Sequence, residues 1–532
     1  MKILLVIPRY ALTNKRNYEY TFPLGLAYIS SVMKKEGYDV DCLNLNHYNG
    51  TTNQILNKKL NSKKYDIVCS GHIGIGYSII KKITNISKSH PTKPLVIIGG
   101  TIITSEPKLM FESLKPDFAV VGEGEITIIE LLDTIKNNKD LSKVNGIIYR
   151  KNNKTEFTSP RKVIENIDNL LIPDFESLNF EKQLENRAGN SIFDYPRIYP
   201  IMCSRGCPFQ CTFCYHCLGF KYRERSIENV MEELRKNVKK YKINIINIYD
   251  DLFSINKKRL YKFCDEIKKL IGELDWECKW TCQLSVINVD KEMLKKLKSS
   301  GCYAVSFGFE SYSQKVLDSM RKPITPKLID NAIRLVFEEK MPLMGNFIFG
   351  DRAETTETAK ETLDYCKKYC NGQIKIYFIQ PYPGSEIYNH CIKKGIIKDK
   401  LNFIKNEISH ITWYNMTDKM TDKEVLQLKK EILKTRRKYF KHIIPFKLKR
   451  EKKSNKFSIH TKCPYCNKKI QYKNCIIENP FYYTIQLHCR ECSMGYYAVS
   501  RPYKISTDYY DELDYLRKKY LFIRDNIRKK KI

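Results

Sequence analysis

The strongest constraint on this chain is a repeated alternation of short apolar runs with amphipathic helical patterns. The alternation occurs twice, over residues 1 to about 130 and again from residue 198 to about 400. Short apolar runs bounded by glycine or proline are typical of buried strands, and helical patterns between them indicate a parallel sheet with helices on both faces. The sequence therefore predicts an α/β chain with two sheet-containing domains.

The first region predicts a Rossmann-like parallel sheet. Its apolar runs lie at residues 2–8, 38–46, 65–74, 94–100 and 117–125. Such sheets bind ligands beyond the carboxyl ends of their strands. Six glycines are expected there, where they would let the backbone approach a ligand closely: Gly71, Gly74, Gly99, Gly100, Gly122 and Gly124. No G-x-G-x-x-G follows the first run, so a dinucleotide site is not predicted.

The second region predicts six strands in a row. They are expected within residues 197–204, 243–250, 276–284, 304–311, 343–350 and 374–382. Helical patterns separate them, for example at residues 226–241 and 325–340. Six strand–helix repeats indicate a barrel or a partial (β/α)6 barrel, whose working face is the carboxyl end of its strands.

Five cysteines crowd the segment that follows the first strand of this barrel. They are Cys203, Cys207, Cys211, Cys214 and Cys217. Thiolates are soft ligands that suit zinc or an iron–sulfur cluster. A four-thiolate zinc site usually pairs two separated C-x2-C turns, and this segment has no such partner nearby. An iron–sulfur cluster is therefore the favoured interpretation.

The frame C-x3-C-x2-C at this position resembles the signature of radical S-adenosylmethionine (SAM) enzymes. Cys207, Cys211 and Cys214 fit the frame, and Phe213 precedes the last cysteine as in that family. The resemblance implies that the three thiolates hold a 4Fe–4S cluster whose open iron binds SAM. One electron from an external reductant then cleaves SAM to a 5′-deoxyadenosyl radical. Cys203 and Cys217 fall outside the frame and are interpreted as bystander thiols.

Further segments resemble the cobalamin-binding branch of this family. Paired aspartates occur in residues 249–253, a strand ending in Glu-Ser in residues 301–322, a glycine-containing loop in residues 345–355 and a Pro-Gly segment in residues 380–388. The resemblance implies cofactor-binding roles for Phe213, Asp250, Asp251, Glu310, Ser311 and Gly350. Asp351, Arg352 and Ala353 replace the Leu-Pro-Gly that the branch usually carries, which leaves the substrate open.

The first region resembles the same branch, over residues 7–46 and 97–125. The resemblance implies a cobalamin against the carboxyl edge of the first sheet, facing the barrel. Its predicted contacts are Ser70, Gly71, Gly99, Gly100, Thr101, Gly122 and Glu123. The alternative is a domain of this fold that has lost its corrinoid. No D-x-H-x-x-G follows the first strand, so His47 and His72 are interpreted as loop histidines and the lower axial ligand of cobalt stays unassigned.

A second set of cysteines lies near the end of the chain. Cys463 and Cys466 form one C-x2-C turn, and Cys489 and Cys492 form another, with 22 residues between the two turns. Four thiolates from two such turns predict a closed, structural zinc site in a small ribbon module. Rubredoxin-like iron and a second iron–sulfur cluster are the alternatives. Cys475 is interpreted as a spare thiol.

Composition limits the other classes. The net charge of +34 invites a nucleic-acid role, but the lysines are spread along the whole chain. The densest basic run, residues 436–456, is interpreted as a solvated linker. No long apolar run predicts a transmembrane segment, and the first residues lack a signal cleavage site, so a cytoplasmic location is predicted.

Six segments are predicted from these patterns. They are a Rossmann-like cobalamin-binding domain (1–145), a linker (146–195), a radical SAM partial barrel (196–400), a helical basic linker (401–455), a zinc-ribbon-like module (456–505) and a helical tail (506–532). The ribbon is expected to have a structural role, in which its metal site stabilises the fold.

The resemblance implies an enzyme, a cobalamin-dependent radical SAM methyltransferase that methylates an unactivated carbon. Such a C–H bond has no useful acidity, so a general base could not activate it. The alternatives are a cyclase or oxidative rearrangement catalyst of the same branch and, from another class, a nucleic-acid-associated module. The expected partners are a reductant and an unidentified small-molecule or lipid-like substrate.

Overall fold

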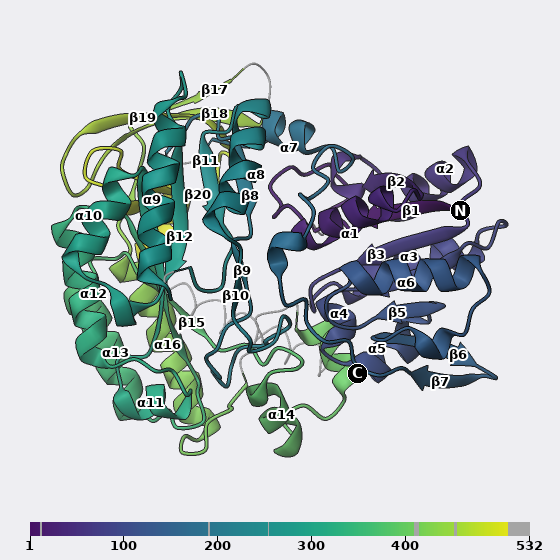
Figure 1. Ribbon diagram of the computed structural model, residues 1–532. Coiled ribbons are helices and arrows are strands. Elements are labelled where there is room, and N and C mark those ends of the chain that lie inside the picture. Colours follow the sequence, from purple (N-terminus) through teal and green to yellow (C-terminus); the bar gives the residue numbers. More distant parts are fainter. Residues whose placement is uncertain (11–12, 190–191, 254, 409–413, 452–454, 509–532) are drawn as a thin grey trace, which may run out of the picture.

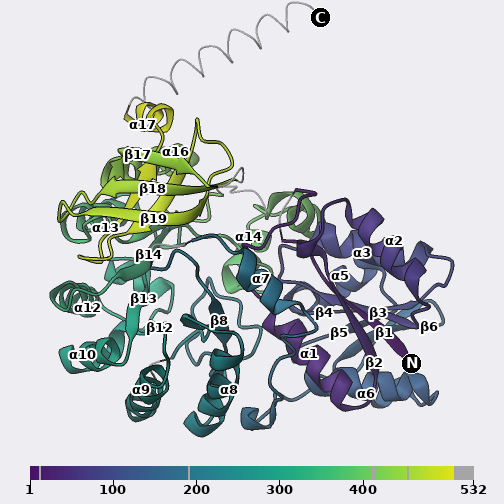
Figure 2. The ribbon, with the colours of Figure 1, turned by 90° about the horizontal axis from the view of Figure 1, so that it is seen from above.

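The computed structural model describes residues 1–10, 13–189, 192–253, 255–408, 414–451 and 455–508 (Figure 1). Two sheets with parallel strands lie side by side in it, each covered by helices, and a small carboxyl-terminal β module lies against the second (Figures 1 and 2). This arrangement confirms the predicted α/β fold with an amino-terminal Rossmann-like sheet and a central partial barrel.

The first sheet is built on five parallel strands. They are β1 (Lys2–Ile7), β2 (Asp39–Asn44), β3 (Ile67–Gly71), β4 (Leu95–Gly99) and β5 (Phe118–Val120), in the order β2-β1-β3-β4-β5. The helices around them are α1 (Leu24–Lys35), α2 (Thr52–Ser62), α3 (Tyr77–Ser89), α4 (Thr101–Thr104), α5 (Pro107–Leu114) and α6 (Glu125–Lys136). Five successive residues of β1, from Ile3 to Ile7, are completely buried because helices cover both faces of the sheet.

A hairpin extends this sheet beyond the predicted domain end at residue 145. Strands β6 (Ile147–Lys151) and β7 (Lys154–Phe157) pair antiparallel to each other, and β6 pairs antiparallel to β5. Asn152 and Asn153 form the turn with positive φ angles of 50° and 62°, a conformation that asparagine tolerates. The linker predicted from residue 146 therefore begins as part of the sheet. Its later part carries α7 (Phe180–Asn186), and the Phe175 ring packs at a tilt against Tyr199 of the barrel, with 4.8 Å between ring centroids.

The second sheet contains six parallel strands in sequential order. They are β8 (Ile198–Ile201), β11 (Ile245–Ile248), β12 (Lys279–Leu284), β13 (Cys302–Glu310), β14 (Leu343–Phe349) and β15 (Lys375–Phe378). The connecting helices are α8 (Ile227–Lys240), α9 (Lys257–Gly272), α10 (Lys291–Ser299), α11 (Gln314–Ser319), α12 (Pro326–Glu338) and α13 (Thr356–Tyr369). The two edge strands, β8 and β15, do not pair with each other, so the barrel is partial.

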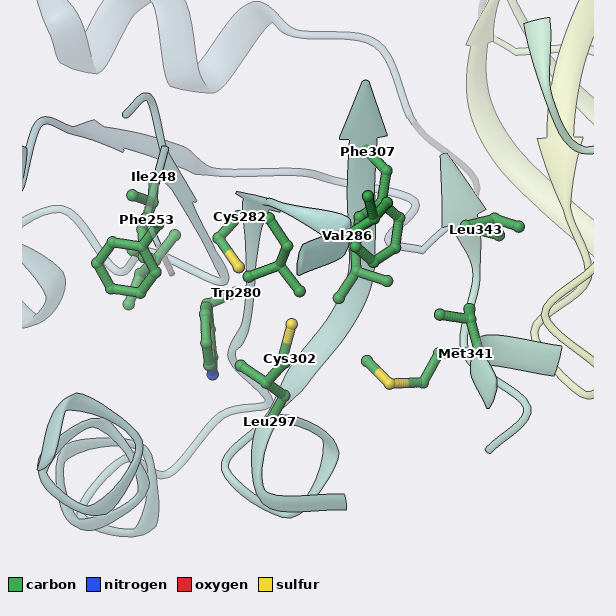
Figure 3. Packing of buried hydrophobic residues seen from close by; sticks show 14 of the residues in the cluster. Ile248, Phe253, Trp280, Cys282, Val286, Leu297, Cys302, Phe307, Met341 and Leu343 are labelled. Carbon is green, nitrogen blue, oxygen red and sulfur yellow. The ribbon is translucent and has the colours of Figure 1, made fainter. Parts of the chain in front are cut away.

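Apolar side chains fill the space between this sheet and its helices (Figure 3). The ring of Trp280 is completely buried, packs edge-on against Phe263 at 5.1 Å between centroids, and donates its indole N–H to the Ser300 carbonyl at 2.9 Å. Cys282 and Cys302 lie in the same core among hydrocarbon neighbours, as small apolar residues do. Space for ligands is thereby confined to the carboxyl ends of the strands.

Helix α16 (Asp422–Tyr439) crosses the barrel near its last strand. It packs against α13 and β15, and its buried residues Val425, Leu428 and Ile432 belong to the barrel core. Helix α14 (Glu386–Lys393) and the short α15 (Lys400–Asn402) precede it. At 18 residues, α16 is the longest helix in the described ranges. None of the helices described combines the length and the hydropathy needed to cross a bilayer.

The carboxyl-terminal module begins earlier than the sequence predicted. Its strands are β16 (His442–Ile443), β17 (Lys447–Arg450), β18 (Lys456–Lys462), β19 (Lys469–Ile476), β20 (Thr484–His488) and β21 (Gly495–Val499). Two of them lie in the basic run 436–456, and β17 pairs with β18, so this part of the run is not a linker. Leu448 packs on the module core between exposed lysines, which hides the strand in a charged sequence. Of the predicted tail 506–532, helix α17 (Arg501–Asp508) reaches residue 508, and the rest lies outside the described residues.

Candidate functional site

The cysteine-rich segment forms a loop that is closed at its base. Strands β9 (Ser204–Arg205) and β10 (Arg223–Glu224) pair antiparallel and bring the two ends of the loop together. Gly206 follows β9 with φ of 81°, and a Cβ there would lie 2.3 Å from the Lys221 carbonyl oxygen. Only glycine fits this position, so Gly206 determines where the chain leaves the strand. We call residues 206–222 the cysteine loop.

Three thiols of this loop line one cavity at the carboxyl end of the barrel. Cys207, Cys211 and Cys214 border a space of about 880 Å³, which we call the barrel cavity. The Cys214 amide donates to the Cys211 carbonyl at 3.1 Å, and the Thr212 amide donates to the Met320 carbonyl at 3.0 Å. A hydrogen bond from the Cys214 thiol, together with the Lys322 ammonium nearby, lowers the pKa of the Cys211 thiol. The donors and the space therefore fit the predicted iron–sulfur cluster.

Glu310 reaches the barrel cavity from the end of β13. Its φ is 62°, in the left-handed region that is uncommon for residues other than glycine, and the pairing of β13 with β14 is irregular at this point. Its carboxylate accepts from the Lys322 ammonium at 3.0 Å. A Cβ on Gly308 would lie 2.3 Å from a Glu310 carboxylate oxygen, so the missing side chain makes room for this ion pair.

Lys322 is a cavity residue that the sequence analysis did not single out. Burial alone would lower its pKa, but the Glu310 carboxylate and the nearby Cys211 thiol leave the pKa raised, so the ammonium stays charged. Its position after α11 becomes part of the site only because the chain folds back over the cysteine loop. Lys322 ends the segment 301–322 that resembles the family, but the sequence analysis assigned roles there only to Glu310 and Ser311.

The predicted cofactor residues of the barrel separate into two groups. Phe213, Asp251 and Glu310 line the barrel cavity. Asp250, Ser311 and Gly350 are not among the residues that line it. Their predicted contact with a cofactor is therefore not supported by the geometry.

Asp250 holds the residues that lead into the cysteine loop. Its carboxylate accepts from the Cys203 amide at 2.6 Å and from the Ser204 hydroxyl at 2.7 Å, and burial raises its pKa to about 6. Ser311 is also buried and bonds to the Thr362 hydroxyl at 3.2 Å. Gly350 turns the chain after β14 with φ of 97°. These three residues shape the backbone at the strand ends and do not line the cavity.

All seven residues predicted as corrinoid contacts line a second cavity. This space of about 550 Å³ lies at the carboxyl edge of the first sheet, and we call it the sheet cavity. The residues are Ser70, Gly71, Gly99, Gly100, Thr101, Gly122 and Glu123. Gly122 has φ of 80°, and a Cβ there would enter open space. A glycine-lined, largely apolar wall fits a flat macrocycle such as a corrinoid.

Glu123 lines the sheet cavity and also takes part in an ion-pair network. Its carboxylate accepts from Arg205 at 3.0 Å and Arg223 at 2.9 Å, and also from the Ile164 amide at 2.7 Å. Arg205 also donates to Glu125 at 2.6 Å. All four charged side chains are buried, and the pKa of Glu123 is lowered because these partners outweigh the effect of burial. This ion-pair network joins the first sheet to the base of the cysteine loop, and it occupies both oxygens of Glu123.

The two cavities lie on opposite sides of the same segments. Cys217 and Leu218 of the cysteine loop line the sheet cavity, whereas Tyr215 and His216 line the barrel cavity. The end of β11 is divided in the same way, with Tyr249 on the sheet cavity and Asp251 on the barrel cavity. Ligands in the two cavities would therefore be separated by little more than one layer of chain.

The four carboxyl-terminal thiols form a compact group. The sulfur atoms of Cys463, Cys466, Cys489 and Cys492 all lie within 4.8 Å of one another. Each turn is closed by an amide that donates to a thiol, Tyr465 to Cys463 and Cys492 to Cys489, both at 3.4 Å. Two such turns fit a tetrahedral ion such as zinc. Cys475 is buried away from the group in the module core, as a spare thiol.

Two family models match this chain in the regions just described. The model of the radical SAM superfamily matches residues 201–366, and the model of the B12 binding domain matches residues 13–132.

Three curated relatives align over about three quarters of this chain. An uncharacterized methyltransferase of Pyrococcus horikoshii, PH0819, is 31% identical over 75% of this chain and 84% of its own length. Cytidylyl-2-hydroxyethylphosphonate methyltransferase of Streptomyces wedmorensis is 26% identical over 74% of this chain and 82% of its own. Anaerobic magnesium-protoporphyrin IX monomethyl ester cyclase of Rubrivivax gelatinosus is 26% identical over 76% and 73%.

A solved structure shares the fold at low identity. The radical S-adenosylmethionine methyltransferase TsrM of Kitasatospora setae, solved with cobalamin and a [4Fe-4S] cluster bound, superposes with a TM-score of 0.60. It is 16% identical and covers 74% of this chain and 76% of its own. At that identity the likeness establishes the fold, in agreement with the two-sheet arrangement described above.

Proposed function

The chain belongs to the radical SAM superfamily, in the branch with an amino-terminal B12 binding domain, and from this premise we propose a cobalamin-dependent methyltransferase that acts on an unactivated carbon. The observation that carries the proposal is the adjacency of the two cavities. A methyl carrier in the sheet cavity and a radical generator in the barrel cavity would face each other across residues 215–218.

The groups that would occupy the cavities supply the hard chemistry. A cluster held by Cys207, Cys211 and Cys214 would provide the electron that cleaves SAM, and a corrinoid would carry the methyl group. The side chains of the protein position and shield these groups. Lys322 offsets negative charge beside the thiols, and Glu310 offers a carboxylate to the polar part of SAM.

The substrate is proposed to enter the barrel cavity from the side of α16. Lys429 and Arg436 of this helix line the cavity together with Tyr377 and Tyr382. Cationic and aromatic side chains in this part of the wall suit a small molecule that combines an anionic group with an apolar surface.

The proposal is tested with a metabolite extract from a strain that lacks the gene. Protein reconstituted without oxygen with iron, sulfide and hydroxocobalamin would be reduced and given SAM with a deuterated methyl group. We expect a compound that accumulates in the mutant to gain one deuterated methyl group. A product that forms without the label, by loss of hydrogen or gain of oxygen, would instead identify a cyclase or an oxidative rearrangement catalyst. A cyclase is the alternative considered because an anaerobic cyclase is among the relatives.

A further inference from the structure

His72 occupies a special place in the first sheet. It directly follows β3, whose neighbours are β1 and β4. The strand order of the parallel core reverses between β1 and β3, and ligands of such sheets bind outside the carboxyl ends of the strands at this point. His72 lines the sheet cavity there, together with Tyr10, whose ring lies 4.8 Å from the imidazole between centroids.

The imidazole of His72 is fixed by contacts with the backbone of residues 73 and 76. The His72 carbonyl accepts from the Ile102 amide at 3.1 Å, which ties the loop to the start of α4. Nδ1 lies 2.9 Å from the Ile73 carbonyl oxygen. A Cβ on Gly76 would lie 2.1 Å from Cγ and 2.2 Å from Nδ1, so this edge of the ring lies directly against the chain. The opposite edge, which carries Nε2, points away from that contact.

The hydrogen bond at Nδ1 determines the tautomer. A carbonyl oxygen can only accept, so Nδ1 carries the proton and Nε2 keeps a lone pair. In the described part of the chain, Nε2 has no hydrogen-bond partner, and it is not among the fully buried polar atoms. Burial lowers the pKa of His72, so the imidazole is neutral at pH 7. Histidines that bind metals characteristically donate their other ring N–H to a carbonyl or carboxylate in this way.

We propose that Nε2 of His72 is the axial ligand of cobalt when a corrinoid occupies the sheet cavity. This inference rests on the proposed function, because it requires that a corrinoid binds. It assigns the lower axial position to a residue that follows the third strand of the sheet.

The other donors in the sheet cavity fit this role less well. Cys69 and Cys217 also line it, but burial raises the pKa of Cys217 and raises that of Cys69 to about 12, so both thiols are protonated near pH 7. Met202 and Cys217 come from the barrel side. His47 does not line the cavity, and its Nε2 is 2.8 Å from the Tyr20 hydroxyl.

The test uses the magnetic coupling between cobalt and its axial nitrogen. The full chain would be produced with nitrogen-15 histidine, loaded with unlabelled hydroxocobalamin and reduced by one electron, and its electron paramagnetic resonance spectrum recorded. Labelled histidine at the axial position would turn the nitrogen triplet into a doublet. The benzimidazole of the cobalamin itself would leave a triplet, and water would leave no nitrogen splitting.

We expect the doublet in the wild-type chain and in His47→Ala. In His72→Ala it should vanish and should return as an imidazole-derived triplet when unlabelled imidazole is added. Gly76→Ala keeps the histidine but displaces its ring, so it should also lose the doublet while still binding the corrinoid. A triplet or an unsplit spectrum in labelled wild-type protein with bound cobalamin would overturn the inference and leave the proposed function standing. Failure of the chain to bind cobalamin at all would overturn both.

Discussion

The two sets of cysteine ligands use the same chemistry in opposite settings. In the ribbon, four sulfur atoms lie within 4.8 Å of one another and surround a point, which leaves no position for a further ligand. In the cysteine loop, three thiols border a cavity of about 880 Å³ beside Glu310 and Lys322. The difference indicates that the first set stabilises a module, whereas the second leaves room for a cosubstrate.

The supports of the two sites differ as well. The ribbon turns are closed by their own amides and by the β strands on either side. The cysteine loop depends on distant residues, with Asp250 beneath it and the Glu123–Arg205–Arg223 network at its base. A structural site can form locally, while a catalytic site has to bring together several parts of the fold.

The largest effect is expected from Cys211→Ala. Loss of one thiolate should remove the cluster, and with it at least about a thousandfold of the 5′-deoxyadenosine formation, equivalent to about 4 kcal/mol in the barrier. Cys203 lies outside the cavity, so Cys203→Ala is the matched control and should keep its iron. Undiminished deoxyadenosine formation by Cys211→Ala would remove the distinction between the two cysteine sets.

A smaller effect is expected from Glu310→Gln. Its carboxylate lines the barrel cavity and pairs with Lys322, so the change should weaken SAM binding by about tenfold, or about 1.4 kcal/mol. Equilibrium dialysis of the reconstituted protein measures this affinity. The exposed Glu338 pairs along its own helix with Arg334, so Glu338→Gln should bind SAM as the wild type does. Equal affinity in all three proteins would exclude Glu310 from the SAM site.

The ribbon variant Cys489→Ser should change the rate of SAM cleavage little, but it should change the metal content of the chain. We expect the purified chain to lose its zinc and the melting of the carboxyl-terminal module to shift to lower temperature, since binding energy at a structural zinc is folding energy. Deoxyadenosine formation should fall by no more than a few-fold, because the module contacts the barrel far from the thiols, through Tyr465 and Asn371. Cys475→Ala is the control that should retain zinc. A complete loss of cleavage in Cys489→Ser would give the ribbon a direct catalytic role.

The last prediction concerns stability against pH rather than catalysis. Burial raises the pKa of Asp250 in the folded chain from its ordinary 3.8 to about 6, so the folded chain binds this proton more tightly than the unfolded chain. Its contribution to stability is therefore present at low pH and is lost as the pH rises from about 4 to about 6, by up to about 3 kcal/mol. Asp250→Asn should flatten this part of the profile of melting temperature against pH. An unchanged slope would show that Asp250 does not titrate in this range.

Much of this architecture could be predicted from local patterns. The alternation of strands and helices gave both sheets, and the spacing of cysteines singled out both thiol sets. The seven residues at the edge of the first sheet were found because parallel strands end at a common edge, so Ser70, Gly100 and Gly122 meet although they are far apart in the chain.

The residues that sequence analysis missed or misassigned depend on non-local packing. Neighbouring residues at a strand end point to different layers, so Asp251 reaches the cavity while Asp250 supports the loop. Glu123 lies on the sheet cavity, but its partner Arg223 is 100 residues away, and no local pattern predicts such a pairing. Lys322 also belongs to the site through distant parts of the chain, because it pairs with Glu310 and interacts with Cys211.

The most direct test of the central claim is the electron paramagnetic resonance spectrum of the reduced, anaerobically reconstituted chain, recorded with and without SAM. If Cys207, Cys211 and Cys214 hold a cluster with one open iron, a 4Fe–4S signal will be present and will change on addition of SAM, because the cosubstrate binds that iron. A chain without such a signal, or with a signal that SAM leaves unchanged, would contradict the account.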